Sequence, residues 1–249
     1  MCSITLGSTP RFELVIPAAY PEPVYPEFFK SIGLRYKAKL SNLTKLDELS
    51  QQTIDAYYLL RYLMDEKEKL CCSPQPLEMS ITIEEFQIRT DQLMRQLTTI
   101  LQYKIPESSK PYGLMFELFA NAALSHAIAY NCKPSKLGSP IQLCVERIRA
   151  ALEEIDIPSF QIAFPEMMLW VIVTGGVASI TTPHQAFFIK VLADACLAAG
   201  ICNVTEEMHL FLGGFMWSIL YVNPAAKFFW DEVAAAQVQS AEAKKGSGG

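Results

Sequence analysis

The chain has 249 residues, of which 51% are hydrophobic and 19% are charged, and its formal net charge is −5 at pH 7. This composition excludes a disordered chain, because disordered segments combine low hydrophobicity with high net charge. A chain of this length can bury a sizeable core without disulfides or metals. The acidic balance argues against unaided binding of nucleic acid, which needs a concentrated basic face.

The two ends of the chain differ in composition from its body. Five prolines lie within residues 1–27, and each of them fixes its own φ and favours extended geometry in the residue before it. We therefore expect an extended N-terminal arm over 1–27. The helical part is expected to cover 28–240, and residues 241–249 are expected to form a flexible tail.

Between these ends, apolar residues recur with the helical period of 3.6. The first apolar stripe runs from Leu43 to Met64, and the charged residues 65–69 are expected to end this helix in solvent. Thr82 and Glu85 form a capping box at the start of the next helix. Pro106 is expected to end that second helix.

Prolines and capping residues mark the starts of the later helices. The expected starts are Pro111, Ser139, Pro165, Thr182, Asn203 and Pro224. Alternation of apolar and polar residues, which is typical of strands, does not persist outside the N-terminal arm. We therefore expect an all-α fold, a single multi-helix domain of about eight helices preceded by the extended proline-rich arm.

Two uncharged apolar runs, 167–180 and 210–222, resemble membrane spans. A span needs about 20 residues, and shorter runs are typical of buried core helices. We expect both runs to lie in the core. Their glycine pairs, Gly175–Gly176 and Gly213–Gly214, indicate the close approach of another backbone, because glycine is costly inside a helix unless something packs against it.

The cysteines and histidines show no pattern of a metal or catalytic site. Seven cysteines without regular spacing indicate free thiols in a reducing compartment. The three histidines, His126, His184 and His209, are far apart, and each is expected to be structural or exposed. His126 lies in a nearly continuous apolar helix, where its ring needs a polar partner.

Sequence motifs of common enzymes are also missing. The chain has no glycine-rich phosphate loop, no Gly-x-Ser-x-Gly and no His-Glu-x-x-His, which are the signatures of nucleotide-binding proteins, serine hydrolases and zinc proteases. We therefore expect no enzymatic activity, no catalytic residue, no cofactor and no metal site in this chain.

One stretch, from Phe164 to Ala178, resembles a helix in the regulatory region of fungal zinc binuclear cluster transcription factors. The resemblance rests on Pro165, the Leu169–Trp170 pair and the ending Gly175-Gly176-Val177-Ala178, followed by Pro183 and the pair Phe187–Phe188. The family has a tryptophan where this chain has Phe187. A second match covers Phe215-Met216-Trp217 and the segment Phe228-Phe229-Trp230-Asp231-Glu232-Val233. Looser agreement extends the resemblance to residues 30–236.

The resemblance implies a regulatory domain without the DNA-binding part of the family. That part is a six-cysteine cluster holding two zinc ions, and this chain has no such cysteine spacing. The chain looks like the C-terminal regulatory part alone, cut from a longer protein or encoded by a gene that lost the cluster. Zinc is expected only if a cluster is encoded elsewhere. The residues expected to form a packed core or pocket are Trp170, Gly175, Gly176, Trp217 and Trp230.

The resemblance also implies a nuclear protein that controls transcription through a small-molecule effector or a protein co-regulator. Neither direct DNA binding nor membrane binding is expected of this chain, and a homodimer stays open. The alternative is an all-α metabolic enzyme or small-molecule carrier with a histidine-containing apolar cavity, in the cytoplasm. A third hypothesis, a membrane-associated protein, depends only on the two apolar runs.

Overall fold

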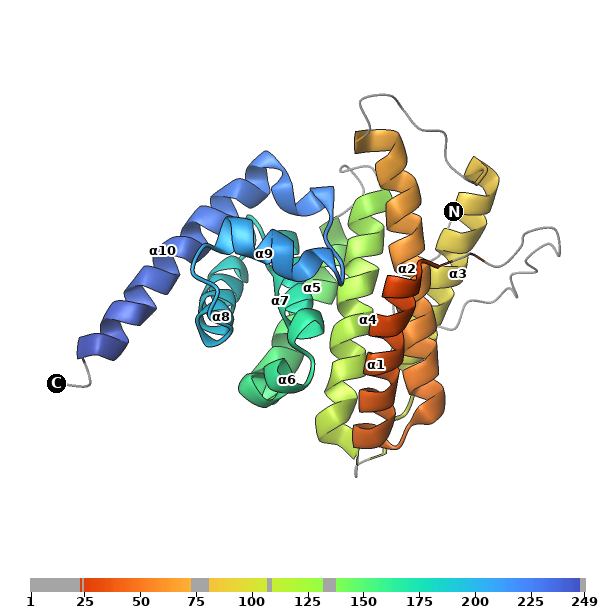
Figure 1. The fold of residues 1–249 in the computed structure, drawn as a ribbon, viewed down its shortest axis with the longest axis horizontal. Helices are drawn as coiled ribbons and strands as arrows, with labels where there is room; N and C mark the ends of the chain where they lie inside the picture. Colours follow the sequence, from red (N-terminus) through yellow and green to blue (C-terminus); the bar gives the residue numbers. More distant parts are fainter. Residues whose placement is uncertain (1–22, 24, 73–80, 107–108, 132–137, 247–249) are drawn as a thin grey trace. The chain divides into compact units, whose positions relative to one another are not determined.

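The computed structural model describes residues 23, 25–72, 81–106, 109–131 and 138–246. Within these residues the chain forms ten α-helices and a short 3-10 helix, and no strand (Figure 1). The prediction of an all-α fold is therefore confirmed. The chain divides into two compact units, 1–127 and 128–249, and the division falls within α4. The proposed extended arm over 1–27 lies almost entirely outside the described residues.

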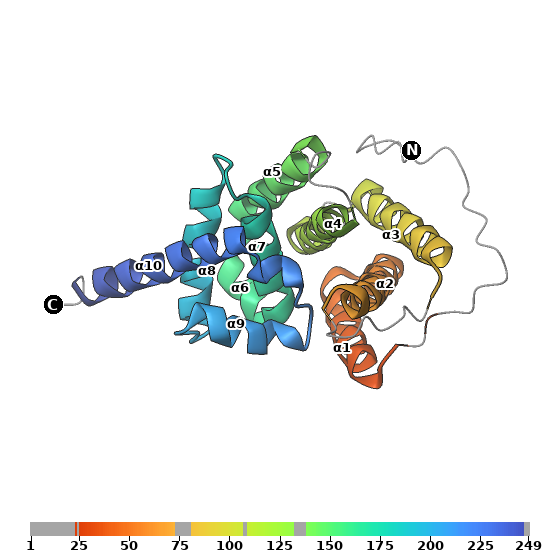
Figure 2. The same cartoon turned by 90° about the horizontal axis from the view of Figure 1, so that it is seen from above.

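The first unit is built from long helices. They are α1 (Glu27–Thr44), α2 (Asp47–Cys72), α3 (Ile83–Gln102) and the larger part of α4 (Lys110–Asn131). Helix α2 contacts both α1 and α3 and lies between them (Figure 2). The core contains side chains from all four helices, among them Tyr36, Tyr57, Leu97 and Phe119, each of which is at most 1% exposed.

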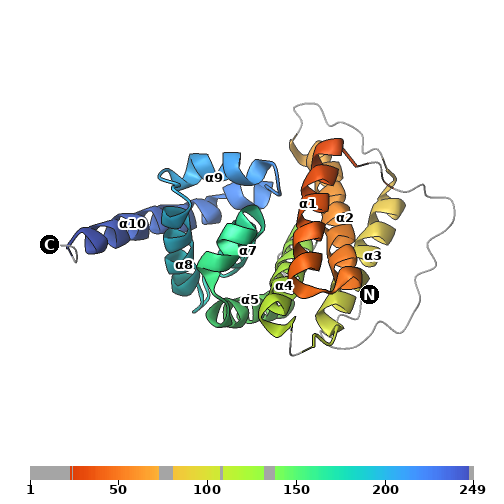
Figure 3. The same ribbon diagram turned by 60° about the horizontal axis from the view of Figure 1, so that its bottom comes forward.

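The second unit is organised around one apolar helix. Its elements are α5 (Gly138–Glu154), α6 (Ile157–Ala163), α7 (Pro165–Ala178), α8 (Gln185–Ala198), α9 (Val204–Gly213), η3 (Ile219–Val222) and α10 (Pro224–Gly246). Helix α7 contacts α5, α6, α8 and α9. Helix α10 packs across α8 (Figure 3). Residues 167–176 of α7 are all buried. The prediction that the run 167–180 belongs to a core helix is therefore confirmed for 167–176, whereas α7 ends at Ala178.

Most of the helix starts expected at prolines and caps lie within one residue of those observed, but α8 begins at Gln185 instead of Thr182, and α3 ends at Gln102, before Pro106. The hydroxyl of Thr82 accepts a hydrogen bond from the backbone N–H of Glu85 (3.1 Å), as a capping box requires. The carboxylate of Glu85 instead accepts a bond from Nε of Arg89 (2.7 Å). Helices α7 and α10 begin at Pro165 and Pro224, where a proline loses no helical hydrogen bond.

The first apolar stripe is divided between two helices. Lys45 ends α1 in the left-handed conformation, with φ of 60°, and its N–H bonds to the carbonyl of Ser41. The expectation of one helix across this point was wrong, and α1 was missed. Left-handed helix ends usually carry glycine or asparagine, so a lysine gave no signal of the break.

The charged residues 65–69 do not end α2. The helix continues to Cys72, and Glu66 is only 2% exposed, with its carboxylate bonded to the ammonium of Lys69. The expected solvated end is therefore wrong at Glu66. The charged composition of this segment predicts exposure to solvent. However, packing against a neighbouring helix and pairing with a cation can bury one of its carboxylates.

Three further differences concern the second unit. Helix α6 was missed, although Pro158 stands in its first turn, where proline is tolerated. The apolar run 210–222 is not one core helix, because it spans the end of α9, a loop and η3, and Leu210 is 77% exposed. Helix α10 extends into the expected tail as far as Gly246, through alanine-rich residues of high helix propensity.

None of the described helices is both long enough and apolar enough to cross a membrane. The two apolar runs therefore give no transmembrane helix in the part of the chain that the structure covers.

Candidate functional site

The glycine pair of α7 makes room for two aromatic rings. A Cβ at Gly175 would stand 2.8 Å from Cζ of Phe188 in α8, and a Cβ at Gly176 would stand 3.0 Å from Cε2 of Phe229 in α10. Real Cβ atoms essentially never come within 3.0 Å of another atom. The two glycines therefore let α8 and α10 place a ring directly on the backbone of α7.

The groups that approach the glycines of α7 differ from those expected. The neighbours of Gly175 and Gly176 are aromatic side chains, whereas the sequence suggested another backbone. At Gly213 a Cβ would meet nothing within 4 Å. The second glycine pair therefore does not mark close packing at its first residue, because the end of α9 leaves open space there.

The three tryptophans of the motifs singled out from the sequence all lie in the second unit. Trp170 is fully buried in α7, and its ring lies edge-on to Phe215, with centroids 5.9 Å apart. Trp217 is half-buried in the loop before η3 and stacks on Trp230 of α10 at 6.3 Å. Trp217 also lies edge-on to the exposed ring of His209, with ring centroids 5.2 Å apart.

Buried hydrogen bonds tie η3 to α7 and α10. The hydroxyls of Thr174 and Tyr221 lie 2.9 Å apart, and both residues are buried. The indole N–H of Trp230 donates to the carbonyl of Tyr221 (2.7 Å). A buried polar group without a partner costs free energy, so these bonds fix the position of Tyr221 against both helices. The residues singled out from the sequence thus lie in an aromatic core with few polar groups.

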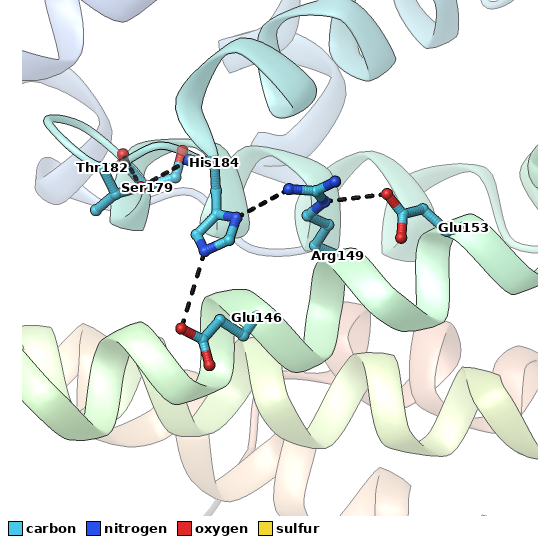
Figure 4. A network of polar contacts seen from close by, with 6 residues as sticks. All are labelled: Glu146, Arg149, Glu153, Ser179, Thr182 and His184. Atoms are coloured by element: carbon cyan, nitrogen blue, oxygen red, sulfur yellow. Dashed lines mark hydrogen bonds and ion pairs between the residues drawn. The ribbon is translucent and has the colours of Figure 1, made fainter.

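A second arrangement surrounds His184, in the turn between α7 and α8 (Figure 4). The guanidinium of Arg149 donates from Nη1 to Nδ1 of His184 (3.2 Å), while its Nε donates to the carboxylate of Glu153 (3.0 Å). The carboxylate of Glu146 lies 3.9 Å from Nε2 of His184. The guanidinium carbon of Arg149 also lies 5.2 Å above the ring of Phe187.

The chemistry of this network follows from its donors. Because a guanidinium only donates hydrogen bonds, Nδ1 of His184 must accept from Arg149, and the proton of the neutral ring is on Nε2. That proton faces Glu146, at a distance longer than a hydrogen bond. The side chain of Glu146 is 52% exposed, so the network lies at the surface and joins α5 to the start of α8.

Sequence reasoning did not find this network. Arg149 and Glu153 are one helical turn apart, which indicates an ion pair on α5. However, His184 lies 35 positions after Arg149, and no local pattern connects the two. Only the packing of α7 against α5 brings the imidazole, in the turn after α7, to the guanidinium.

Burial determines the protonation state of His126 and of two cysteines. His126 of α4 is 1% exposed, and burial, assisted by the charge of Arg61, lowers its pKa from 6.5 to about 3. Burial also raises the pKa of Cys144 and of Cys196 to about 12, against a small lowering by Arg147 at Cys144. At neutral pH, His126 is an uncharged ring and both cysteines are protonated thiols.

Free thiols are confirmed for Cys144, Cys196 and the exposed Cys202. The side chains of the remaining cysteines, Cys2, Cys71, Cys72 and Cys132, lie outside the described part of the chain. Among the described residues, no group of three or more His, Cys, Asp or Glu side chains could hold a metal ion.

Comparisons of the chain with models of protein families, with curated proteins and with solved structures found no match. A function can therefore be argued only from the residues and their geometry.

Proposed function

We propose that the chain is a non-enzymatic regulatory domain of a fungal transcription regulator. In this proposal it acts in the nucleus and controls transcription through a small-molecule effector or a protein co-regulator. The proposal rests on the resemblance of its motifs to the regulatory region of fungal zinc binuclear cluster factors.

The observation that supports it most is the packing of the motif residues on one another. Gly175 receives the ring of Phe188, Gly176 receives the ring of Phe229, and Trp217 stacks on the neighbouring Trp230. The residues that carry the resemblance are distant in the sequence, yet they pack on one another in one aromatic core, and this packing supports the proposal.

The alternative remains an all-α enzyme or carrier with a histidine in an apolar cavity. His126 fits that description by its burial, but a pKa of about 3 makes it a weak base. His184 has a carboxylate nearby, yet this carboxylate is half exposed to solvent. The low pKa of His126 and the exposure of the carboxylate beside His184 both argue against a catalytic histidine, so we favour the regulatory domain.

A reporter assay tests the proposal. The full chain is fused to a heterologous DNA-binding domain in a fungal host, and the reporter output is compared with that of the DNA-binding domain alone. We expect the fusion to change the output and to make it respond to nutrient conditions. The variant Gly176→Ala should weaken this response by disturbing the aromatic core, whereas the matched variant Gly213→Ala should preserve it. A fusion that accumulates but behaves like the DNA-binding domain alone would contradict the proposal.

The proposal also predicts that this chain alone does not recognise DNA. Its net charge of −5 opposes the binding of phosphates, and we expect it to bind duplex DNA no better than an unrelated acidic protein. A salt titration of DNA affinity measures this. Sequence-specific binding at physiological salt would show a DNA-reading surface that the proposal does not contain.

A further inference from the structure

Two half-buried tyrosines of α2 form an aromatic surface in the first unit, which we call the tyrosine platform: Tyr58 and Tyr62. They are four residues apart, which places their rings on the same side of the helix, one turn from each other. The ring of Tyr25, from the segment before α1, stacks on that of Tyr58, with centroids 5.1 Å apart and an angle of 26° between the planes. It also lies edge-on to Tyr62, at 6.2 Å. One side chain thus contacts both rings of the platform.

The segment that carries Tyr25 is proline-rich. Pro23 and Pro26 stand on either side of Tyr25, and Pro26 has φ of −55° and ψ of 142°, which is close to the polyproline II conformation. Segments of this conformation dock on surfaces lined by aromatic side chains, because their backbone is already fixed and loses little entropy on binding. The contact of Tyr25 with the platform has the features of this mode of recognition.

Contacts other than Tyr25 hold Tyr58 in place. Its hydroxyl donates a hydrogen bond to the carbonyl of Lys30 in α1 (3.0 Å). Its ring lies against α1 at Gly33, where a Cβ would stand 2.5 Å from Cζ of the ring. The ring of Tyr57, which is 1% exposed, lies 5.6 Å away on the core side. These contacts fix the ring whether or not Tyr25 covers it.

Tyr62 is held from the side of α3. The guanidinium carbon of Arg89 lies 5.9 Å above its ring, a cation–π contact. Arg89 is itself fixed, because its Nε bonds to the carboxylate of Glu85 (2.7 Å) and both side chains are at most 10% exposed. Both rings of the platform are therefore positioned before any proline-rich segment binds, and such pre-organisation lowers the cost of binding.

We propose that the tyrosine platform is a binding site for a proline-flanked tyrosine of a partner protein, in the polyproline II conformation, and that Tyr25 occupies this site within the chain itself. A partner segment then binds only in molecules whose own Tyr25 has left the platform. Its apparent affinity is reduced in proportion to the fraction of such molecules. This inference depends on the first unit alone and is independent of the proposed function of the chain.

A phosphorylated tyrosine fits the platform less well than an unmodified one. Burial raises the pKa of Tyr58 and of Tyr62, and nearby carboxylates raise both further, Asp55 at Tyr58 and Glu66 at Tyr62. The same carboxylates would repel a phosphate group, which carries nearly two negative charges at neutral pH. The positive charge of Arg89 is already paired with Glu85. We therefore expect the platform to select the neutral side chain.

A binding experiment with the full chain tests the proposal. The probe is a fluorescein-labelled peptide with the sequence of residues 21–27, Pro-Glu-Pro-Val-Tyr-Pro-Glu. One matched control peptide has alanine in place of the tyrosine, and another has alanine in place of the three prolines. We expect fluorescence anisotropy to show that the variant Tyr25→Ala, which vacates the platform, binds the probe about tenfold more tightly than the unchanged chain does. Both control peptides should bind more weakly than the probe.

Two double variants make the result specific. Tyr25→Ala with Tyr62→Ala should lose the gain in affinity, because half of the platform is missing. Tyr25→Ala with Tyr112→Ala should keep it, because Tyr112 is an exposed tyrosine of α4 outside the platform. The thermal unfolding midpoint shows that each variant is folded, and the control peptides test the site even if the Tyr62 variant is not.

Several outcomes would overturn the proposal. They are equal affinity of Tyr25→Ala and of the unchanged chain for the probe, equal binding of the probe and the control peptides, and an equal loss in the Tyr62 and Tyr112 variants. Tighter binding of the same peptide with a phosphorylated tyrosine would overturn it in favour of a phosphopeptide partner.

Discussion

The ring of Phe229 occupies the space that a side chain at Gly176 would need. Phe229 belongs to α10 and Gly176 to α7, and a Cβ at Gly176 would stand 3.0 Å from Cε2 of the ring and closer still to Cζ. Phe229 is fully buried, so its ring has little freedom to move away. The contact between α7 and α10 therefore depends on the absence of a single methyl group.

Replacement of Gly176 by alanine should destabilise the protein. Overpacking a buried contact costs about 1 to 3 kcal/mol, which outweighs the gain of about 0.5 to 1 kcal/mol expected from alanine in a helix. Gly213→Ala is the matched control, since nothing lies within 4 Å of its added Cβ, and it should be neutral or stabilising. Urea unfolding measures both. A neutral or stabilising Gly176→Ala would refute close packing at this motif.

The bond between Thr174 and Tyr221 should be measurable in a double-mutant cycle. Thr174→Val removes one hydroxyl and leaves that of Tyr221 buried without this partner, and Tyr221→Phe does the reverse. We expect each single variant to cost about 1 to 3 kcal/mol, and the double variant to cost less than the sum by about 1 kcal/mol. Chemical unfolding of the four proteins gives the coupling energy, and additive losses would show that the two hydroxyls do not interact.

His126 should make stability depend on pH. Its pKa is about 3 in the folded protein and about 6.5 when unfolded, so between these values only the unfolded chain takes up the proton. Its contribution to stability is therefore complete above pH 6.5 and is lost as the pH falls. Between pH 7 and pH 5 the free energy of unfolding should fall by about 2 kcal/mol through this group.

The variants His126→Asn and His126→Leu remove this titration. Between pH 7 and pH 5, the free energy of unfolding of each variant should fall by about 2 kcal/mol less than that of the unchanged protein. This difference does not depend on the stability of the variant at pH 7. Urea unfolding at both pH values provides the measurement. The same pH dependence in the variants would mean that His126 is not a buried neutral ring.

The cysteines should differ in reactivity according to burial. Cys144 and Cys196 are buried thiols with pKa values raised to about 12, whereas Cys202 is exposed. Because the thiolate is the reactive form, iodoacetamide at pH 8 should modify Cys202 first and reach the other two only when the protein unfolds. Peptide mass spectrometry, with Cys202→Ser as control, measures the order of labelling. Early labelling of Cys144 or Cys196 in the folded protein would contradict their burial.

The sequence by itself determined the class of the fold and the positions of most helices. The apolar period of 3.6 and the local signals at Thr82, Pro165 and Pro224 act within a few residues of the chain, so they can be recognised without knowledge of the tertiary structure. The break at Lys45 was not recognisable in this way, because a left-handed lysine has no local advantage.

Only the tertiary structure decided which residues meet. The motifs singled out Trp170, Gly175 and Gly176, but the rings that fill the space beside the glycines come from α8 and α10. In the same way, Arg149 contacts His184 only when α5 packs against α7 and the turn that follows it. Helical periodicity predicts which face of a helix is apolar, whereas the neighbour of that face depends on packing between segments that are distant in the chain.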